Sequence, residues 1–292
     1  ASAQTKAPSP APVKPNYADS LQAVVVTTKN WETTQGTARL YERRSLKDAW
    51  KAVGKDFPIT VGRSGLGIDD TSKWSEEVAH SVKREGDGRS PAGLFPLTSA
   101  FGKPESVKTK LSYQSLSEQT ECVDDVNSHH YNKIVNRLQV GIFDWKSSEK
   151  MASITPEYDL GVFVAYNTYP VVKGRGSCIF LHIWESPNDA TSGCTAMERS
   201  NLEKIVAWAD QQPGVVNAQI AMQNEDGTGA QVLVTPTTGP DEVATEELLA
   251  GAEASARAAV AEARRILLLL TPDDAGTCGT PGAPGAPCAD RR

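Results

Sequence analysis

Short runs of hydrophobic residues, separated by turn residues, occupy most of the chain between residues 21 and 236 and predict a mostly β fold. Runs rich in Val, Ile, Phe and Thr predict strands at 21–28, 37–44, 57–63, 161–166, 178–184, 216–222 and 230–236. The run at 37–44 alternates in part, which indicates one solvent-facing side. The run at 178–184, CIFLHIW, is almost wholly apolar, so we expect it to be buried on both faces.

Two segments show helical spacing instead. Residues 45–54 predict a short helix that stops at Gly54, on the apolar positions Leu46, Ala49, Trp50 and Val53. Residues 200–212 predict a second helix, opened by a capping box of Ser200 and Glu203. Its apolar stripe consists of Leu202, Ile205, Val206 and Ala209.

Shifts in composition divide the chain into four segments. Residues 1–18, rich in Ala, Pro and Ser, predict a flexible linker, and residues 19–236 the folded domain. Residues 237–271 predict a C-terminal helix whose early acidic residues and late arginines suit the helix dipole. Residues 272–292 form a tail rich in Gly and Pro, which cannot build a core.

Charge and hydropathy narrow the classes of partner. The 292 residues carry a net charge of −6, and the densest basic run, Lys83-Arg84, is followed at once by Glu85 and Asp87, which argues against nucleic-acid binding. The aliphatic run at 266–270 is far shorter than the roughly 20 residues that span a membrane. The small residues at the start fit a mature end left by removal of an export signal, although an artificially trimmed chain would begin in the same way.

The chain has five cysteines, and an odd number in an exported protein suggests one free thiol. If Cys194 is free, the other four allow three connectivities. The short Pro-Gly segment between Cys278 and Cys288 favours that pair, which leaves Cys122 with Cys178. A cytosolic chain of unpaired buried thiols remains the alternative.

Residues 181–197, LHIWESPNDATSGCTAM, hold the best candidate for chemistry. Cys194 could be a nucleophile and His182 its base, with the amides of Gly193 and Cys194 facing a developing oxyanion. A catalytic thiol of this kind is expected to ionise below about pH 8.5. The structural alternative is a buried strand histidine satisfied by a backbone carbonyl, with Cys194 as a small turn residue.

Other chemistries find less support. His129 and His130 are adjacent and cannot both face one metal, and no HExxH, CxxC, P-loop or GxSxG pattern is present, so no metal or cofactor is expected. A second polar stretch, KREGDGRSPAGLFPL at 83–97, reads as a shaped loop and not as a core element. Four residues of the segment that follows Cys122 could line a pocket but are better explained as caps of a turn and a short helix: Asp124, Asp125, His130 and Tyr131.

Taken in order, GDG leading into SPAGLFPL, then GSCIFLHIW and TSGCTAM, resemble the L,D-transpeptidase (YkuD-type) family, in the branch with a short His-to-Cys spacing. The segment 121–135 also resembles that branch, and the resemblance spans about residues 58–210. It implies a catalytic domain built on a twisted, mixed β-sheet, exported to the periplasm or cell envelope and acting on peptidoglycan stem peptides. We expect a monomer without a transmembrane segment.

The resemblance also implies roles for single residues. Cys194 would be the nucleophile, His182 the general base, and Gly193 would shape the oxyanion site. Attack on the L-centre carbonyl of the diamino acid in a tetrapeptide stem would release the terminal D-Ala. The thioester would pass to the amine of another stem, which forms a cross-link, or to water, which trims the stem.

Two positions depart from the family pattern, since Ser192 replaces a His and Ala196 replaces an Arg that could hold the donor carboxylate. Substitutes for that Arg are Arg63, Lys83, Arg84 and Arg175, each of which could equally be a solvated loop charge. We expect substrate contacts from Arg63, Arg84, Asp87 and Ser192. Three functions stay open: a transpeptidase, an L,D-carboxypeptidase or amidase using the same dyad with water, and a non-catalytic wall-binding domain.

Overall fold

The computed structural model describes residues 20–68, 82–210, 215–222 and 230–231. Its strands are β1 (Gln22–Thr28), β2 (Gln35–Glu42), β3 (Lys51–Thr60), β4 (Leu66–Ile68), β5 (Ser90–Gly102), β6 (Ser112–Ser115), β7 (Thr120–Val123), β8 (Lys133–Asn136), β9 (Ser148–Lys150), β10 (Leu160–Val164), β11 (Phe180–Ile183), β12 (Thr195–Met197), β13 (Val215–Met222) and β14 (Ala230–Gln231). Its helices are the 3-10 turns η3 (Met151–Ser153) and η4 (Glu157–Asp159) and the α-helix α1 (Arg199–Trp208). The predicted mostly β fold is confirmed, and each of the seven predicted strands overlaps an observed one.

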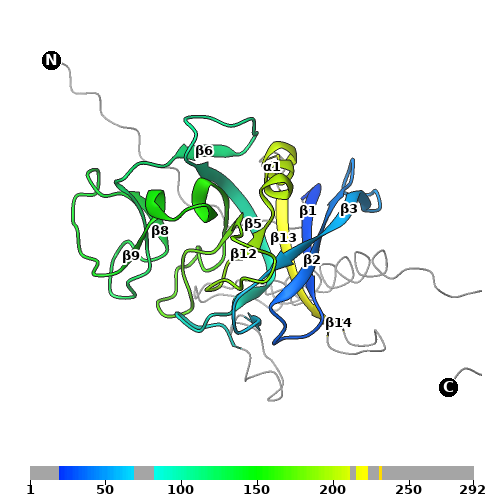
Figure 1. Ribbon diagram of the computed structural model, residues 1–292, viewed down its shortest axis with the longest axis horizontal. Coiled ribbons are helices and arrows are strands. Elements are labelled where there is room, and N and C mark those ends of the chain that lie inside the picture. The colour runs from blue at the N-terminus through cyan, green and yellow to red at the C-terminus, as the bar shows by residue number, and fades with distance from the viewer. Residues whose placement is uncertain (1–19, 69–81, 211–214, 223–229, 232–292) are drawn as a thin grey trace, which may run out of the picture.

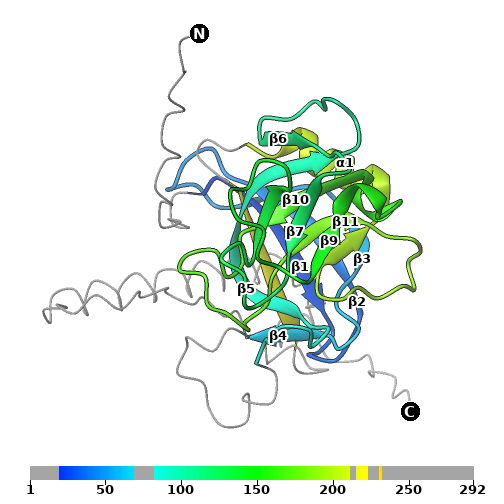
Figure 2. The same ribbon diagram turned by 90° about the vertical axis from the view of Figure 1, so that its left-hand side faces the viewer.

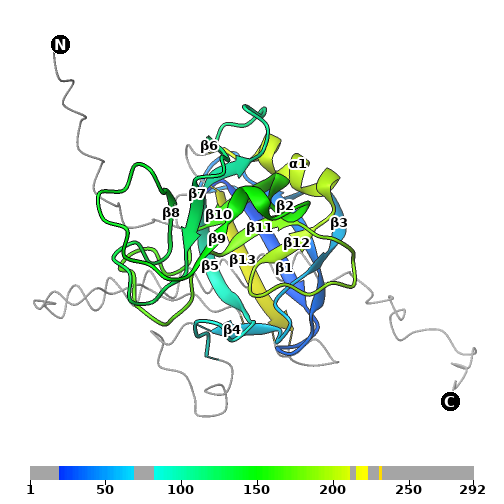
Figure 3. The same cartoon turned by 60° about the vertical axis from the view of Figure 1, so that its left-hand side comes forward.

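The larger sheet is mixed and twists until it closes on itself. Within the described residues it runs in the order β14-β13-β1-β2-β3-β12-β11-β10-β5-β4, and β5 also pairs with β13. The pairs β1–β13 and β11–β12 are parallel, whereas β1–β2, β2–β3 and β10–β11 are antiparallel. Because β5 reaches both β10 and β13, the strands surround one apolar core (Figures 1 and 3).

A second, smaller sheet packs beside the first. It has the order β8-β7-β9, and all its pairings are antiparallel. Figure 1 places it on the side opposite β2 and β3, and Figure 2, which looks from that side, shows β7 and β9 in front of β10 and β11. The sequence did not predict this sheet, because its strands are only three or four residues long and largely polar.

Helix α1 packs against β10 and β11 through the predicted apolar stripe. Leu202, Ile205, Val206 and Ala209 are all buried, so this prediction is confirmed. The predicted capping box is wrong: the helix begins at Arg199, Glu198 is the cap residue, and no side chain caps the helix. The Glu198 carbonyl instead accepts the amides of Asn201 and Leu202.

The helix predicted at 45–54 is not formed, because this segment turns and enters β3. Glu42 pairs with Lys51 and Leu40 pairs with Val53 across the β2–β3 hairpin. The helical spacing does not mark one buried face, since Leu46 is 50% exposed while Trp50 is 5% exposed. The Trp50 ring is covered by the Arg43 guanidinium, 4.6 Å from its centroid. Strand pairing in the β2–β3 hairpin thus outweighs a weak local helical pattern.

The stretch 83–97 was expected to lie outside the core, and this expectation is wrong from Ser90 onward. Residues 90–102 form β5, the longest strand of the described chain. The strand changes partner along its length: β4 pairs with 90–92, β13 with 93–97 and β10 with 97–102. Pro and Gly, which argue against a strand in sequence, are tolerated here because no single partner follows β5 throughout.

Some expectations fall outside the described residues. The N-terminal linker (1–18), the C-terminal helix (237–271), the tail (272–292) and the pair Cys278–Cys288 all lie there, and the domain boundaries remain predictions. Within the described part, no helix is long and apolar enough to cross a membrane.

We predict that Leu202→Ala lowers the free energy of unfolding by about 2–5 kcal/mol, because it leaves a cavity where α1 meets the sheet. The neighbouring Glu203 is exposed, so Glu203→Ala should change stability by no more than about 0.5 kcal/mol. Urea unfolding followed by tryptophan fluorescence measures both. Equal losses in the two variants would contradict this packing.

Candidate active site

The parallel pairing of β11 and β12 brings His182 and Cys194 together. Leu181 pairs with Thr195, and His182 pairs with Ala196. Side chains alternate along a strand, so His182 and Ala196 share one face, and Cys194, two positions before Ala196, points the same way. Both His182 and Cys194 line one cavity.

His182 is held in the tautomer that a base requires. Its Nδ1 lies 2.7 Å from the Ile183 carbonyl oxygen. Because a carbonyl only accepts hydrogen bonds, Nδ1 carries the proton and Nε2 is left as an acceptor. The side chain is 7% exposed, and this burial lowers the pKa of His182 and keeps the imidazole neutral. The expected alternative, a strand histidine satisfied by a backbone carbonyl, and the catalytic role therefore share the same geometry.

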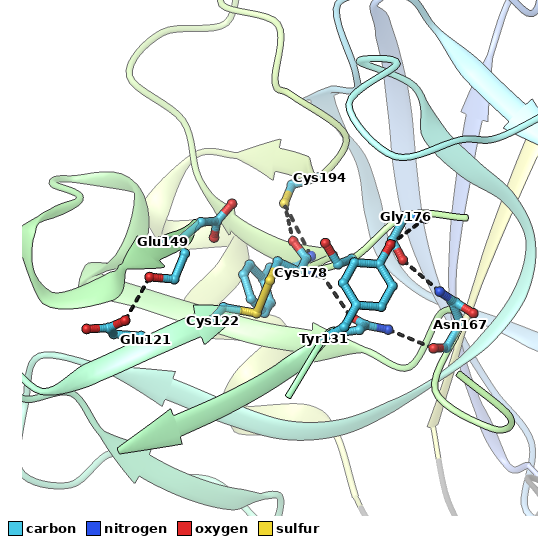
Figure 4. Close-up of a disulfide and its surroundings, with 12 residues drawn as sticks. Glu121, Cys122, Tyr131, Glu149, Asn167, Gly176, Cys178 and Cys194 are labelled. Carbon is cyan, nitrogen blue, oxygen red and sulfur yellow. Dashed lines mark hydrogen bonds between the residues drawn. A yellow bond between two sulfur atoms is a disulfide. The ribbon is translucent and has the colours of Figure 1, made fainter. Parts of the chain in front are cut away.

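Cys194 is a free, buried cysteine. Its Sγ accepts the Phe180 amide at 3.3 Å and donates to the Cys178 carbonyl at 3.4 Å (Figure 4). In the described part of the chain no hydrogen bond joins Cys194 directly to His182. Burial raises the pKa of the Cys194 thiol, and the Glu149 carboxylate raises it further, while the Phe180 amide and Lys83 favour the thiolate. Burial thus acts against the expected lowering of the thiol pKa, which remains a prediction.

The chain around Cys194 is fixed through its own carbonyl. The Cys194 carbonyl accepts hydrogen bonds from Ser90 Oγ at 2.8 Å and Thr191 Oγ1 at 2.6 Å. Ser90 is fully buried, and its Oγ also accepts the Gly62 amide at 2.9 Å. The SPAG motif therefore supplies the hydroxyl that anchors the segment around Cys194, so the two motifs are in direct contact.

Gly193 serves this turn by its backbone conformation. Its φ is +153°, and a Cβ there would lie 3.0 Å from the Arg89 carbonyl oxygen, so a side chain would be strained. The Gly193 amide donates to Thr191 Oγ1 at 3.1 Å. This bond occupies the Gly193 amide, and its expected contribution to an oxyanion site remains a prediction.

A disulfide joins the two sheets directly beneath the thiol. Cys122 on β7 is bonded to Cys178, just before β11 (Figure 4). Cys178 has a φ of +55°, and its amide donates to Asn132 Oδ1 at 2.9 Å. Asn132 in turn donates to the carbonyls of Tyr166 and Asn167. This network holds the unusual backbone of Cys178, whose carbonyl faces the Cys194 sulfur.

The cavity has a volume of about 580 Å³. Its ionisable lining residues are His182, Cys194 and Tyr158, the basic Arg63 and Lys83, and the acidic Glu85, Asp124, Glu149, Glu157, Glu185 and Asp189. Carboxylates therefore outnumber basic groups around the thiol, and a cationic substrate group is electrostatically favoured there.

The expected substrate-binding residues divide into two pairs. Arg63 and Ser192 line the cavity, and Arg63 Nη1 donates to Ser192 Oγ at 3.1 Å. Arg84 and Asp87 do not line it. The Asp87 carboxylate accepts Lys83 Nζ at 2.8 Å and the amides of Arg84 and Arg89. Asp87 therefore organises the Gly-Asp-Gly loop and buries the Lys83 ammonium, which is 3% exposed.

Sequence reasoning missed the residues that enter from the smaller sheet and η4. Tyr158 donates to Glu149 Oε2 at 2.6 Å, and its ring lies 5.6 Å from the His182 ring. The Glu149 carboxylate has its pKa raised to about 7, chiefly by burial. No local motif marks these residues, because Glu149 is brought to the cavity by the β7–β9 pairing and Tyr158 by the packing of η4 against β11.

Residues 124–131 contribute both to a turn and to the lining of the cavity. Asp125 caps the turn by accepting the amides of Asn127 and Lys146, whereas Asp124 lines the cavity. Tyr131 donates to Glu85 and accepts the Gly176 amide. The short helix expected there is absent, and the segment consists of turns. Across the described ranges, no group of His, Cys, Asp and Glu has an arrangement that could hold a metal ion.

A family model for the L,D-transpeptidase catalytic domain, YkuD, matches residues 33–234. The chain belongs to this family. No curated protein matches the chain. Among solved structures, the crystal structure of the helical cell shape determining protein Pgp2 from Campylobacter jejuni is similar over 72% of this chain and 50% of that one, with 15% identity and a TM-score of 0.35. The chain thus spans half the length of that protein, and at this TM-score the likeness adds nothing to the family assignment.

We predict that replacing Cys122 and Cys178 by Ser lowers the free energy of unfolding by about 2–5 kcal/mol, because the disulfide closes a long loop between the sheets. Both proteins would carry Cys194→Ala, so that this free thiol cannot exchange with the disulfide. Urea unfolding with and without reductant makes the measurement. Reductant should destabilise only the protein that retains the pair, and equal midpoints in all four samples would contradict the prediction.

Proposed function

We propose that this chain is a peptidoglycan L,D-transpeptidase that acts through a thioester on Cys194. One observation carries the proposal: His182 and Cys194 lie on one face of adjacent parallel strands and line one cavity, with His182 Nε2 left as an acceptor. A neutral imidazole beside a neutral thiol suits proton transfer during attack, and a resting thiolate is not required.

In the first half-reaction the Cys194 thiol gives its proton to His182 Nε2 as sulfur attacks the L-centre carbonyl of the donor stem. The carbon–sulfur bond forms, and the carbonyl carries the negative charge of a tetrahedral intermediate. Its collapse breaks the carbon–nitrogen bond, and His182 returns the proton to the departing D-Ala amine. We assign the oxyanion contact to the Cys194 amide, because the Gly193 amide is bonded to Thr191.

In the second half-reaction an amine of another stem attacks the thioester. His182 accepts a proton from the amine, the carbon–sulfur bond breaks, and the thiol is regenerated. Water in place of the amine would give an L,D-carboxypeptidase with the same residues. The acidic lining of the cavity supports the amine, because it attracts the acceptor as its ammonium ion, which loses one proton to solvent before the neutral amine attacks.

Arg63 is our candidate for holding the donor's terminal carboxylate. Ala196 lies opposite His182 and offers only a methyl group at the position of the usual family Arg. Of the basic residues that line the cavity, Lys83 is paired with Asp87, whereas no carboxylate in the described chain pairs with Arg63. Arg63 is positioned beside the nucleophile segment by its backbone, since its amide donates to the Thr191 carbonyl at 2.8 Å.

The proposed substrate places the working protein outside the cytoplasm, in the periplasm or cell envelope. A disulfide between Cys122 and Cys178 supports this compartment, because such bonds persist in oxidising surroundings. The proposed nucleophile and base come from one chain, which supports a monomer.

We predict that the protein converts purified tetrapeptide muropeptides to cross-linked dimers and free D-Ala, and that Cys194→Ala abolishes both products. Mass spectrometry of the muropeptides and of the intact protein follows the products and the acyl-enzyme. His182→Ala should also prevent acyl-enzyme formation. Tripeptide without dimer would assign a carboxypeptidase, and unchanged muropeptides with no acyl-enzyme would sink the catalytic proposal in favour of a wall-binding domain.

We predict that Arg63→Gln raises KM for a tetrapeptide donor about tenfold to a hundredfold, because a charge-assisted hydrogen bond to the terminal carboxylate is lost. The control substrate is the same stem with a C-terminal carboxamide, on which the variant should have little further effect. The control variant is Arg84→Gln, since Arg84 is exposed and does not line the cavity. Equal effects of Arg63→Gln on both substrates would remove Arg63 from this role.

A further inference from the structure

Glu149 is built into the site from the smaller sheet. It pairs with Cys122 in the β7–β9 register, and Cys122 is bonded to Cys178, whose carbonyl meets the Cys194 sulfur. Strand β9 is also held on the other face of β7, where Ser148 Oγ donates to the buried Glu121 at 2.7 Å (Figure 4). Glu149 therefore has a fixed place in the cavity, on the disulfide side of the thiol.

An aromatic residue holds the carboxylate in place. Tyr158 Oη donates to Glu149 Oε2 at 2.6 Å. The Tyr158 ring is 5% exposed and makes edge contacts with the rings of Phe180, at 5.4 Å, and His182, at 5.6 Å. Glu149 is thus linked through one side chain to the proposed base and lies close enough to Cys194 to oppose its ionisation.

The surroundings of Glu149 leave its charge without a basic partner. The described residues contain no ion pair to Glu149, and Asp124 Oδ1, which lies in the same cavity, is buried without a hydrogen-bond partner. Burial, together with the charges of Asp124 and Glu85, raises the pKa of Glu149 to about 7. The ionisable groups around this part of the cavity are Tyr158 from η4, Asp124 after β7, Glu85 and Lys83 from the Gly-Asp-Gly loop, His182 from β11 and Cys194 before β12.

We propose that Glu149 binds a primary ammonium group of the substrate, and that this pairing raises the reactivity of the Cys194 thiol, which lines the same cavity. A primary ammonium has three donors, which suits Glu149 together with the unpartnered Asp124 oxygen. Cys194 would then be least reactive in the empty site and more reactive when an amine-bearing stem occupies it. The inference rests on the proposed role of Cys194 as nucleophile and adds a specificity for amine-bearing substrates.

The test measures thiol reactivity, which does not depend on any peptidoglycan reaction. Alkylation of Cys194 by iodoacetamide, followed by peptide mass spectrometry of the full chain, would be timed from pH 5.5 to 9.5. Above pH 7, Glu149→Gln should be alkylated several-fold faster than the parent protein, up to about tenfold for one pKa unit. Below about pH 6 the two rates should converge, because protonated Glu149 is as neutral as Gln.

Glu118→Gln is the matched control. Glu118 carries the same charge but is exposed and does not line the cavity. This variant should leave the rates and their pH dependence near those of the parent protein. Glu149→Asp keeps the charge and should restore slow alkylation, which separates the charge from any packing effect.

A second arm adds n-butylammonium chloride as the amine probe, against sodium chloride at equal ionic strength. Butylammonium should accelerate alkylation of the parent protein at pH 8 in a saturable manner and leave Glu149→Gln unchanged. Equal rates for the parent protein and folded Glu149→Gln above pH 7, or equal butylammonium effects on both, would overturn the inference. If the protein turns over muropeptides but Glu149→Gln does not change the alkylation rate, only this inference fails. If Glu149→Gln changes the alkylation rate but no muropeptide is turned over, only the proposed function fails.

Discussion

The parallel pairing of β11 with β12 is the constraint on which the site depends. His182 lies opposite Ala196, so Cys194 projects from the same face two positions earlier. A shift of one residue in this register would turn Cys194 to the opposite face from His182. The closed sheet opposes such a shift, because β11 is also paired with β10 and β12 is also paired with β3. The two reacting groups are therefore positioned by backbone hydrogen bonds more than by contact with each other.

Two tethers, one on each side of Cys194, add to the positioning that the strand register provides. Ser90 and Thr191 hold the Cys194 carbonyl from one side, and the Cys122–Cys178 disulfide fixes the Cys178 carbonyl against the sulfur from the other. The same tethers bury the thiol, and burial raises its pKa. Precise placement and ready ionisation are thus in conflict at this site. The conflict is resolved if the proton leaves for His182 only as the carbon–sulfur bond forms.

Much of this arrangement could be predicted from the sequence, and the features that could not be predicted share a physical cause. The apolar strand around His182, the α1 stripe and the candidate dyad all rest on local patterns, and the strand and stripe are confirmed. The features that were missed depend on strand pairing and cross-links that local patterns do not encode. The segment around Trp50 joins the β2–β3 hairpin, and β5 changes partner along its length. Glu149 lies opposite Cys122, which a disulfide joins to Cys178, 56 residues away in sequence. The sequence could not distinguish Arg63 and Ser192, which line the cavity, from Arg84 and Asp87, which do not.

The charges around the Cys194 thiol also bear on which substrates the site would select. Lys83 favours the thiolate but is paired with Asp87, while Glu149 opposes it and has no basic partner in the described chain. Burial and the Glu149 charge together favour the protonated thiol over the thiolate. In the proposed mechanism, a substrate with a positively charged group would offset the Glu149 charge, whereas a substrate without such a group would not. In the proposed mechanism, the electrostatic cost of ionising Cys194 would favour amine-bearing stems, without the arginine that the family pattern places at position 196.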